Sequence, residues 1–538
     1  MKTLTPSFVS PTQLKKWLHD GKEIALLDVR EHGQYGEEHL FYVVSTPYSK
    51  LESEVLRLAP RKDVRMVLVG DSNNDLPIKA NQRLFDLGYS QVHILDGGVP
   101  AWRQAGYEVF AGVNLPSKAF GELAEHAFNT PRISALELNE KIANKEDLIV
   151  LDGRPYQEFK KMSIPTAMCC PNGELALRID DIVKNPDTTI VVNCAGRTRS
   201  IIGAQTLINL GLPNKILALE NGTQGWYLAD LKLDHGKTNK HPETIDAHTL
   251  SSRQKRAREL ALKHKVPFVD GATVERWLKE KDRTTYLCDV RTPEEFAHQT
   301  VNGAQHTPGG QLVQATDQYI GTKGARIVVF DQENVRAPAM ASWLAMLGWD
   351  VAVWDGALNH RWSTEHTSQS DSKHSEALVG QTASAQHIAA DQISQHIQAG
   401  ARVLDMRPSM KYREAHLQNA VWTIRPLLNS MSDQIKGQAI VVLAEEESIA
   451  QLAAKDLMEL GAKSVSFNVD HPAKWSQVKL SVESTPEHPS DKECIDYLFF
   501  VHDRHDGNKA AARQYLAWEM NLLAQIDEQE KAAFKLPH

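Results

Sequence analysis

Short apolar runs alternate with amphipathic stretches along most of the chain, and the order of these patterns repeats four times. Each repeat opens with an apolar run that ends in Asp-x-Arg, namely IALLDVR, LIVLDGR, TYLCDVR and ARVLDMR. A second apolar run follows in each repeat, namely VRMVLVGD, TTIVVNC, ARIVVFD and QAIVVLAE. Runs that are apolar throughout are typical of strands buried on both faces of a parallel sheet.

The spacing of the remaining features supports the same fourfold repeat. After each second run, a helical pattern ends in Leu-Gly, where glycine suits the left-handed residue that follows a helix. A third apolar run comes next, and a tryptophan lies 14 or 15 residues beyond the glycine. The glycines are Gly88, Gly211, Gly348 and Gly461, and the tryptophans are Trp102, Trp226, Trp362 and Trp475.

These patterns predict an α/β protein of four tandem domains, each a parallel sheet covered by helices, with a helical tail. We expect the domains at residues 1–125, 126–245, 246–375 and 376–485, and the tail at 486–538. The polar stretch 363–382 is the best candidate for a linker between domains by composition.

Composition narrows the class of protein. The chain has 538 residues and a net charge of −8, without a concentrated basic face, so we predict no nucleic-acid partner. We expect the basic stretch 251–265 to form a solvated helix. No apolar run of about 18 residues occurs and the first residues do not resemble a signal peptide, so we predict no membrane partner and a cytoplasmic protein.

One cysteine stands apart from the other four. When the repeats are aligned on their tryptophans, Cys194 occupies a position that holds Asp71, Asp331 and Ala444 in the other copies. For the remaining cysteines, Cys169, Cys170, Cys288 and Cys494, we expect packing in the core as reduced thiols. An alternative is that Cys169 or Cys170 resolves an oxidised Cys194.

The residues around Cys194 predict a nucleophile. The segment VVNCAGRTRS places it at the end of a strand, before a loop that leads into a helix. Backbone N–H groups of such a loop, together with Arg197 and Arg199, stabilise negative charge and would lower the pKa of the thiol. Burial of the cysteine as a small apolar residue is the alternative.

The motifs LDGRPYQEF, CAGRTRS and LENGTQGW of the second repeat, with their counterparts in the other copies, resemble the rhodanese superfamily. The resemblance implies sulfur transfer through a persulfide on Cys194, with thiosulfate or a similar anionic donor and a thiol or cyanide acceptor. It implies substrate binding by Ala195, Gly196, Arg197, Thr198, Arg199 and Ser200, and support of the loop by Asp152 and Arg154. We predict no cofactor and no metal.

Other functions are compatible with parts of this pattern. Related phosphatases and arsenate reductases use Cys-x5-Arg, whereas this chain has Cys-x4-Arg with Ser200 at the later position. A 3-mercaptopyruvate sulfurtransferase and a non-enzymatic persulfide carrier or redox scaffold remain alternatives. We interpret the three repeats without the cysteine as scaffolding, docking surfaces or covers, with a protein sulfur acceptor as a further partner.

The tail shows a helical pattern that starts near Lys509. Its apolar stripe contains Ala512, Leu516, Met520 and Leu523, which we interpret as core packing or as a contact in a homo-oligomer. We interpret the segment HDRHD before this helix as an ion-paired surface. A metal site is the alternative, but it would need further spaced ligands. His502 or Arg504 is an alternative contributor to the mouth of the site.

Overall fold

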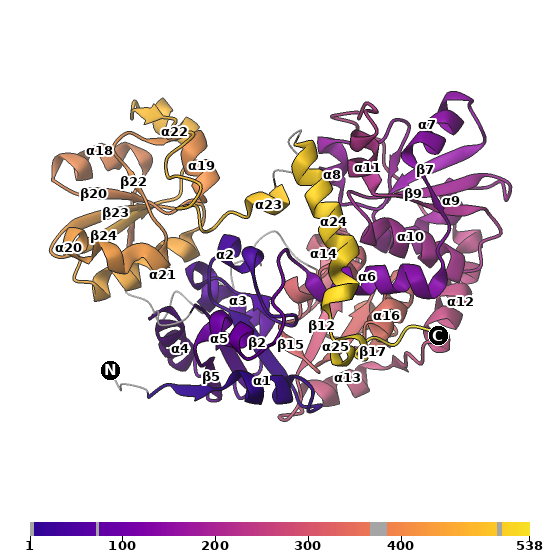
Figure 1. Cartoon of the computed structure of the whole chain (residues 1–538), viewed down its shortest axis with the longest axis horizontal. Coiled ribbons are helices and arrows are strands. Elements are labelled where there is room, and N and C mark those ends of the chain that lie inside the picture. The colour runs from indigo at the N-terminus through magenta and orange to yellow at the C-terminus, as the bar shows by residue number, and fades with distance from the viewer. Residues whose placement is uncertain (1–4, 72–74, 366–384, 503–507, 538) are drawn as a thin grey trace. The chain divides into compact units, whose positions relative to one another are not determined.

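The computed structural model describes residues 5–71, 75–365, 385–502 and 508–537. Within these residues, each repeat contributes five parallel strands to a sheet, in the same spatial order (Figure 1). In every sheet the strand that ends at Asp-x-Arg lies beside the strand that precedes the loop of the second apolar run. The predicted fold, four tandem α/β repeats and a helical tail, is therefore confirmed.

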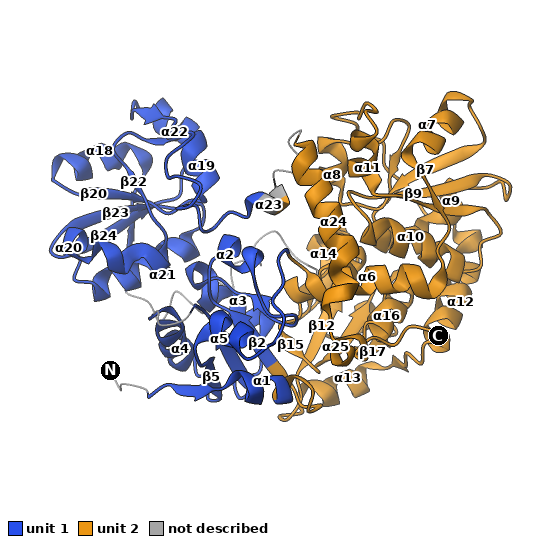
Figure 2. Cartoon of the chain, in the orientation of Figure 1, with its two compact units in different colours: residues 1–16, 25–112, 368–499 blue, residues 17–24, 113–367, 500–538 orange. Residues whose placement is uncertain are grey.

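Two units emerge from the packing of the chain (Figure 2). The first unit holds residues 1–16, 25–112 and 368–499, and thus repeats one and four. The second holds residues 17–24, 113–367 and 500–538, and thus repeats two and three with the tail helix. The predicted domain boundaries stay predictions, and most of the predicted linker 363–382 lies outside the described residues.

Repeat one supplies the first sheet. Its strands, in spatial order, are β1 (Ser7–Val9), β5 (Val92–Leu95), β4 (Met66–Val69), β2 (Ile24–Asp28) and β3 (Val44–Ser45). Its helices are α1 (Pro11–Leu18), α2 (His32–Glu37), η1 (Tyr48–Lys50), α3 (Leu51–Leu58), α4 (Leu76–Asp86) and α5 (Gly98–Gln104).

Repeat four has the same architecture. Its strands, in spatial order, are β19 (Gln386–His387), β24 (Ser464–Asn468), β23 (Ala439–Leu443), β20 (Arg402–Asp405) and β22 (Val421–Trp422), and β21 (His416–Leu417) pairs separately with β25 (Val482–Glu483). Its helices are α18 (Ala390–Gln398), α19 (Ser409–Glu414), η5 (Arg425–Met431), α20 (Ser432–Ile435), α21 (Glu447–Glu459) and α22 (Pro472–Gln477).

A buried ion network joins repeats one and four within the first unit. The guanidinium of Arg425 donates to Glu52 at 2.7 and 2.9 Å and to Asp456 at 2.6 Å. Arg83 donates to the same Asp456 at 2.6 Å. A buried charge is destabilising unless it is paired, so removal of any one of these side chains would leave its partners unpaired. The network therefore stabilises the contact between repeats one and four.

Repeat two contains the cysteine of interest. Its strands, in spatial order, are β6 (Arg132–Ile133), β10 (Ile216–Leu219), β9 (Thr189–Asn193), β7 (Leu148–Asp152) and β8 (Met168–Cys169). Its helices are α7 (Ala135–Ala143), α8 (Tyr156–Lys161), α9 (Asn172–Ile182), α10 (Thr198–Asn209) and α11 (Gly222–Leu228), with α6 (Leu115–Phe128) before them and α12 (Ala247–Lys263) after them.

Both faces of the sheet in repeat two are buried, as its apolar strands predict. Along β9, Val191 packs in one apolar cluster with Trp226, whereas Ile190 and Val192 pack in another with Leu207. Alternate residues therefore face opposite layers. Asp152 lies opposite Asn193 in the parallel pair β7–β9, so both strands end at the same edge of the sheet.

Repeat three completes the set. Its strands, in spatial order, are β11 (Phe268–Val269), β17 (Asp350–Trp354), β16 (Arg326–Phe330), β12 (Thr285–Asp289) and β14 (Gln305–His306). A separate pair is formed by β13 (Gln299–Val301) and β18 (Ser363–Glu365). The short strand β15 (Thr322–Lys323) precedes β16 in sequence and is not part of this sheet. Its helices are α13 (Gly271–Leu278), α14 (Pro293–His298), α15 (Gly309–Gln314), η2 (Thr316–Gln318), α16 (Arg336–Met346) and η3 (Ala357–Asn359).

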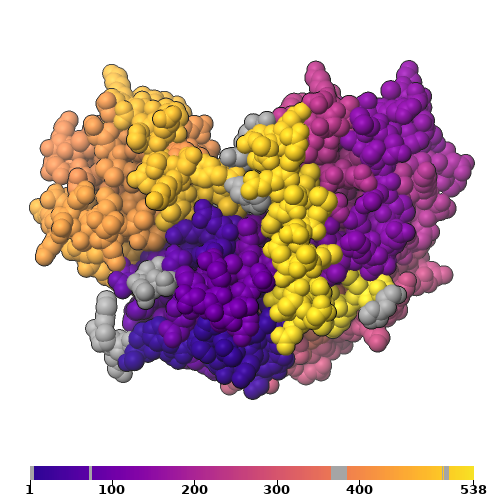
Figure 3. Space-filling view, in the orientation of Figure 1, coloured from indigo at the N-terminus to yellow at the C-terminus, as the bar shows by residue number. Residues whose placement is uncertain are grey.

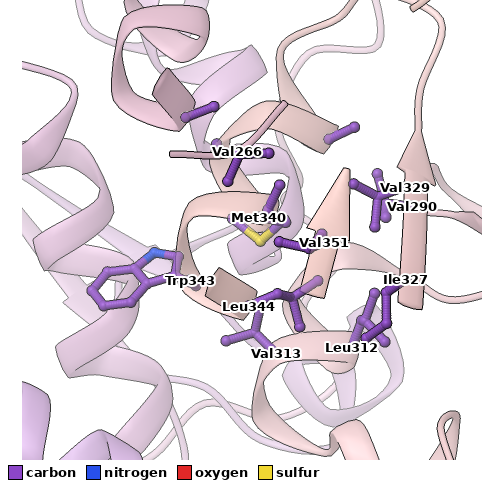
Figure 4. Close-up of a cluster of buried hydrophobic side chains, with 14 of the residues drawn as sticks. Val266, Val290, Leu312, Val313, Ile327, Val329, Met340, Trp343, Leu344 and Val351 are labelled. Atoms are coloured by element: carbon purple, nitrogen blue, oxygen red, sulfur yellow. The ribbon is translucent and has the colours of Figure 1, made fainter. Parts of the chain in front are cut away.

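The core of repeat three extends into repeat two. Met340 and Leu344 of α16 pack toward the apolar strand residues of the sheet, whereas Trp343 of the same helix points away from them (Figure 4). The same cluster includes Phe120 of α6 and Ile202 of α10. Trp343 also donates its indole N–H to the hydroxyl of Thr206 at 2.8 Å.

Two further predictions concern helices and membranes. The basic stretch 251–265 does form a helix, α12, but it is not solvated all round, because Ala257 and Leu260 are buried and Arg253 pairs with Asp181 at 2.7 Å. The tail forms α23 (Phe499–His502), α24 (Lys509–Gln525) and α25 (Glu528–Lys531). None of the helices in the described ranges combines the length and apolarity that a membrane span requires.

Candidate functional site

Cys194 lies in the loop between β9 and α10, at the carboxyl edge of the sheet, where the sequence predicts it. Strand β9 ends at Asn193 and α10 begins at Thr198. The Cys194 side chain is buried, with 1% of the residue exposed. Its Sγ lies 3.2 Å from the hydroxyl of Ser200, which also contacts the carbonyl oxygen of Arg197 at 3.0 Å. The first N–H groups of a helix have no partner within it, so those of α10 are available to an anion at the loop.

Helix α11 holds this loop in place. The N–H of Thr223 donates to the carbonyl oxygen of Cys194 at 2.8 Å, and the N–H of Gln224 donates to that of Ala195 at 3.1 Å. Gly222 has a φ of +54°, and a Cβ there would lie 2.2 Å from the Cys194 oxygen. In the motif LENGTQGW, the backbone at Gly222 therefore approaches the loop so closely that only glycine fits.

Asp152 and Arg154 form a buried pair behind the loop. The guanidinium donates to both carboxylate oxygens at 2.8 and 2.7 Å, and the amide of Asn193 donates to the same carboxylate at 2.9 Å. The other three repeats contain the same bidentate pair, namely Asp28 with Arg30, Asp289 with Arg291, and Asp405 with Arg407. The pair also occurs in the repeats without the cysteine, and the bracing role of Asp152 and Arg154 stays a prediction.

The two arginines that follow the cysteine form ion pairs with carboxylates. Arg197 donates to Glu122 at 2.8 and 2.9 Å and also pairs with Glu125, both of which come from α6. Arg199 donates to Glu158 of α8 at 2.8 and 2.9 Å. The sequence places both arginines at the loop, but their carboxylate partners come from other elements. The predicted binding of an anionic donor by these arginines stays a prediction.

The corresponding loop of repeat three binds its own carboxylate. Asp331 follows β16 as Cys194 follows β9, and its side chain accepts hydrogen bonds from the N–H groups of Val335, Arg336 and Ala337 at 3.2, 3.1 and 3.2 Å. Counted from the first loop residue, these three amides correspond to those of Thr198, Arg199 and Ser200. A loop at this place in the fold is thus able to hold an anion with backbone N–H groups alone.

The loops of repeats one and four differ. In repeat one, the carboxylate of Asp71 is turned toward the guanidinium of Arg30, at 3.2 Å. In repeat four, Ala444 offers no side chain for chemistry and is buried. Among the loops at these four positions, the one in repeat two alone carries a thiol.

The other four cysteines are buried thiols. Burial raises the pKa of Cys169 and of Cys288 to about 12. Burial likewise raises the pKa of Cys170 and of Cys494 above the ordinary thiol value. Since the thiolate is the reactive form, these residues are poor nucleophiles, in agreement with the core packing predicted for them.

The tail helix contributes to the site, which the sequence reading missed. Helix α24 packs against α6 and α11 and lies on the surface of the second unit (Figures 1 and 3). Its buried stripe consists of Ala512, Tyr515, Leu516, Glu519 and Leu522. The predicted stripe was wrong at Met520, which is exposed, because the buried face includes the polar side chains at 515 and 519 instead.

Glu519 lies next to the cysteine loop. A Cβ on Gly196 would lie 3.0 Å from its Oε2 and 3.8 Å from the ring of Tyr515. A helical period counted from Ala512 places Tyr515 and Glu519 on the buried face. The predicted stripe left both residues out because it was restricted to apolar side chains. The predicted alternatives at HDRHD lie almost wholly outside the described residues, and His502 is described only as the last residue of α23.

Comparison with known proteins agrees with this geometry. The family model described as rhodanese-like domain matches residues 10–105, 134–229 and 272–363. A crystal structure of a thiosulfate sulfurtransferase from Pseudomonas aeruginosa is 36% identical, with a TM-score of 0.90 over 98% of this chain and 99% of that one. A Bacillus subtilis (strain 168) protein named "Putative sulfur carrier protein YrkF" is 27% identical over 164 residues, 28% of this chain and 87% of that protein. The chain therefore belongs to the rhodanese family, with the domain repeated along its length.

Proposed function

We propose that the chain is a sulfurtransferase that carries a sulfane sulfur as a persulfide on Cys194. The Cys194 thiolate attacks the outer sulfur of thiosulfate, the S–S bond of the donor breaks, and sulfite leaves with the electron pair. The persulfide anion then passes its outer sulfur to cyanide or to a thiolate, and Cys194 returns to the thiolate form.

The binding of Asp331 by three backbone N–H groups carries this proposal. A persulfide anion on Cys194 would meet the equivalent amides of Thr198, Arg199 and Ser200, which act here as an anion hole. Because Arg197 and Arg199 already pair with carboxylates, these amides are the main donors available to thiosulfate. The similar Pseudomonas aeruginosa protein, described as a thiosulfate sulfurtransferase, supports the choice of donor.

A persulfide carrier without turnover of its own is the second candidate, favoured by the similarity to a protein named as a sulfur carrier. The two functions need the same thiol and differ in catalysis. A carrier accepts one sulfur and waits for a partner protein, whereas an enzyme converts many equivalents of donor with a small acceptor. A 3-mercaptopyruvate sulfurtransferase would differ in the preferred donor.

Mass spectrometry after incubation with thiosulfate or 3-mercaptopyruvate tests the site. We expect the mass of one sulfur atom on the peptide that bears Cys194, and steady production of thiocyanate when cyanide is added. Cys194→Ser should lose both signals, while the control Cys494→Ser, which alters a buried thiol elsewhere, keeps them. Sulfur on another cysteine would refute the assignment, and a persulfide without turnover would identify a carrier.

A further inference from the structure

Glu519 presents to the cysteine loop a carboxylate oxygen that has no hydrogen-bond partner among the described residues. The side chain is fully buried, at 0% exposure. Its Oε1 pairs with Lys118 at 2.5 Å and accepts from the hydroxyl of Tyr515 at 3.3 Å. Among the described residues, Oε2 has no hydrogen-bond partner, and it is the atom that lies beside Gly196. A buried carboxylate oxygen without a donor is costly, so a ligand that donates to it is expected.

Gln224 provides a second unsatisfied group at the same place. Both its Oε1 and its Nε2 are buried and lack a partner within the described part of the chain. The Nε2 would lie 3.7 Å from a Cβ on Gly196. Two polar side chains, one from α24 and one from α11, thus place atoms that lack a partner among the described residues beside one loop residue two positions after Cys194.

The charges near the loop indicate which ligand fits. Arg197 and Arg199 are paired with Glu122, Glu125 and Glu158, so neither guanidinium donates to Glu519. Glu519 Oε2 is therefore an acceptor without a donor. The Gln224 carbonyl, on the same amide as the Nε2 near Gly196, also lacks a donor among the described residues and provides a second acceptor. An ammonium, with three N–H donors, satisfies both.

We propose that the sulfur acceptor is a thiol that carries an ammonium group, and that Glu519 with Gln224 selects it; this inference rests on the proposed function. Gly196 is two residues from Cys194, at most about 7 Å along the chain. The outer persulfide sulfur lies about 2 Å beyond the Cys194 sulfur, and an N–H···O contact adds about 2.9 Å. A thiol with its ammonium two carbons away can therefore bridge the outer sulfur and Glu519. Its thiolate, formed by loss of the proton to solvent, attacks the outer persulfide sulfur. The S–S bond to Cys194 breaks, and the electron pair returns to Cys194.

Three thiols with the same two-carbon chain test the site, namely cysteamine, 2-mercaptoethanol and 2-mercaptoethanesulfonate. With the thiosulfate-loaded protein, kcat/KM is measured for each acceptor in the wild type and in Glu519→Gln. We expect Glu519→Gln to lower the value for cysteamine by about 10-fold to 100-fold, as for loss of a charged hydrogen bond. The value for 2-mercaptoethanol should change little, and that for the sulfonate should rise.

Matched variants separate selection from a loss of fold. Glu528→Gln removes the same charge from an exposed side chain of the tail and should leave the three ratios unchanged. Lys118→Met removes the cation beside Oε1 and should strengthen the preference for cysteamine. Equal slowing of all three thiols by Glu519→Gln, or a wild type without preference, would overturn the ammonium site alone. Absence of any persulfide on Cys194 would overturn the proposed function and this inference together.

Discussion

The loops after β9 and β16 lie at equivalent places in their repeats and hold different groups at the first position. In repeat three, the Asp331 carboxylate is bound by three backbone amides, and the position is closed to ligands. In repeat two, Cys194 meets the hydroxyl of Ser200 instead, and the equivalent amides are left for an incoming anion. The fold therefore supplies the backbone donors of the anion hole. The side chain at the first loop position determines whether these donors bind the protein's own carboxylate or remain for a ligand.

Converting the loop of repeat two to that of repeat three should have the largest effect. In Cys194→Asp, the new carboxylate can take the amides as Asp331 does, so the fold is kept while the nucleophile is lost. We expect thiocyanate production to fall by about 10³-fold or more. The thermal midpoint should stay close to that of the wild type. A Cys194→Asp protein that is unfolded would show that the two loops are not equivalent.

Most of the loop could be predicted from the sequence, because its position depends on local patterns. The apolar run before Cys194 predicts the strand, and Gly211 and Trp226 mark the ends of the helix and of the third strand that follow it. The fourfold repeat gives the alignment of Cys194 with Asp331. Asp152 and Arg154 are two residues apart in sequence, so their pairing is local as well. These features need no knowledge of how distant segments pack.

The partners of the loop could not be predicted in the same way. Glu122 and Glu158 reach Arg197 and Arg199 from α6 and α8, and their approach depends on helix packing rather than on spacing. Glu519 comes from the tail, more than 300 residues after the loop. A buried glutamate in an amphipathic helix is read as solvent-facing, since carboxylates are seldom buried without a partner.

The ion pairs behind the two loops should differ in their contribution to stability. Arg336 is fully buried and donates to Glu295, which is 29% exposed, at 2.7 and 2.8 Å. The equivalent pair is more exposed on both sides, with Arg199 at 11% and Glu158 at 40%. We expect Glu295→Gln to lower the free energy of unfolding by about 1–3 kcal/mol. The matched Glu158→Gln should cost less than about 1 kcal/mol, because its pair is screened by solvent. Urea unfolding at pH 7 measures both.

The cost of Glu295→Gln should also depend on pH. Burial alone would raise the pKa of Glu295, but the Arg336 guanidinium outweighs burial and holds it at about 2. A carboxyl with a lowered pKa contributes stability above its ordinary pKa and loses it as the pH falls toward the folded value. The difference between wild type and variant should therefore shrink below about pH 4.5. A constant difference down to about pH 3 would contradict the assigned pair.

The smallest effect should come from the hydroxyl that repeat two has and repeat three lacks. Ser200 corresponds to Ala337, and its Oγ lies 3.2 Å from the Cys194 sulfur. Ser200→Ala should lower kcat/KM for thiosulfate by about 3-fold to 10-fold, the loss of one hydrogen bond to the reacting sulfur. Ser342→Ala is the matched control, since Ser342 also contacts a carbonyl three residues earlier in a helix but lies in α16. If both variants lower activity equally, the role of the Ser200 hydroxyl is to support the helix. The backbone amides, bound to Asp331 in repeat three and left for a ligand in repeat two, would then be the feature that distinguishes the two loops.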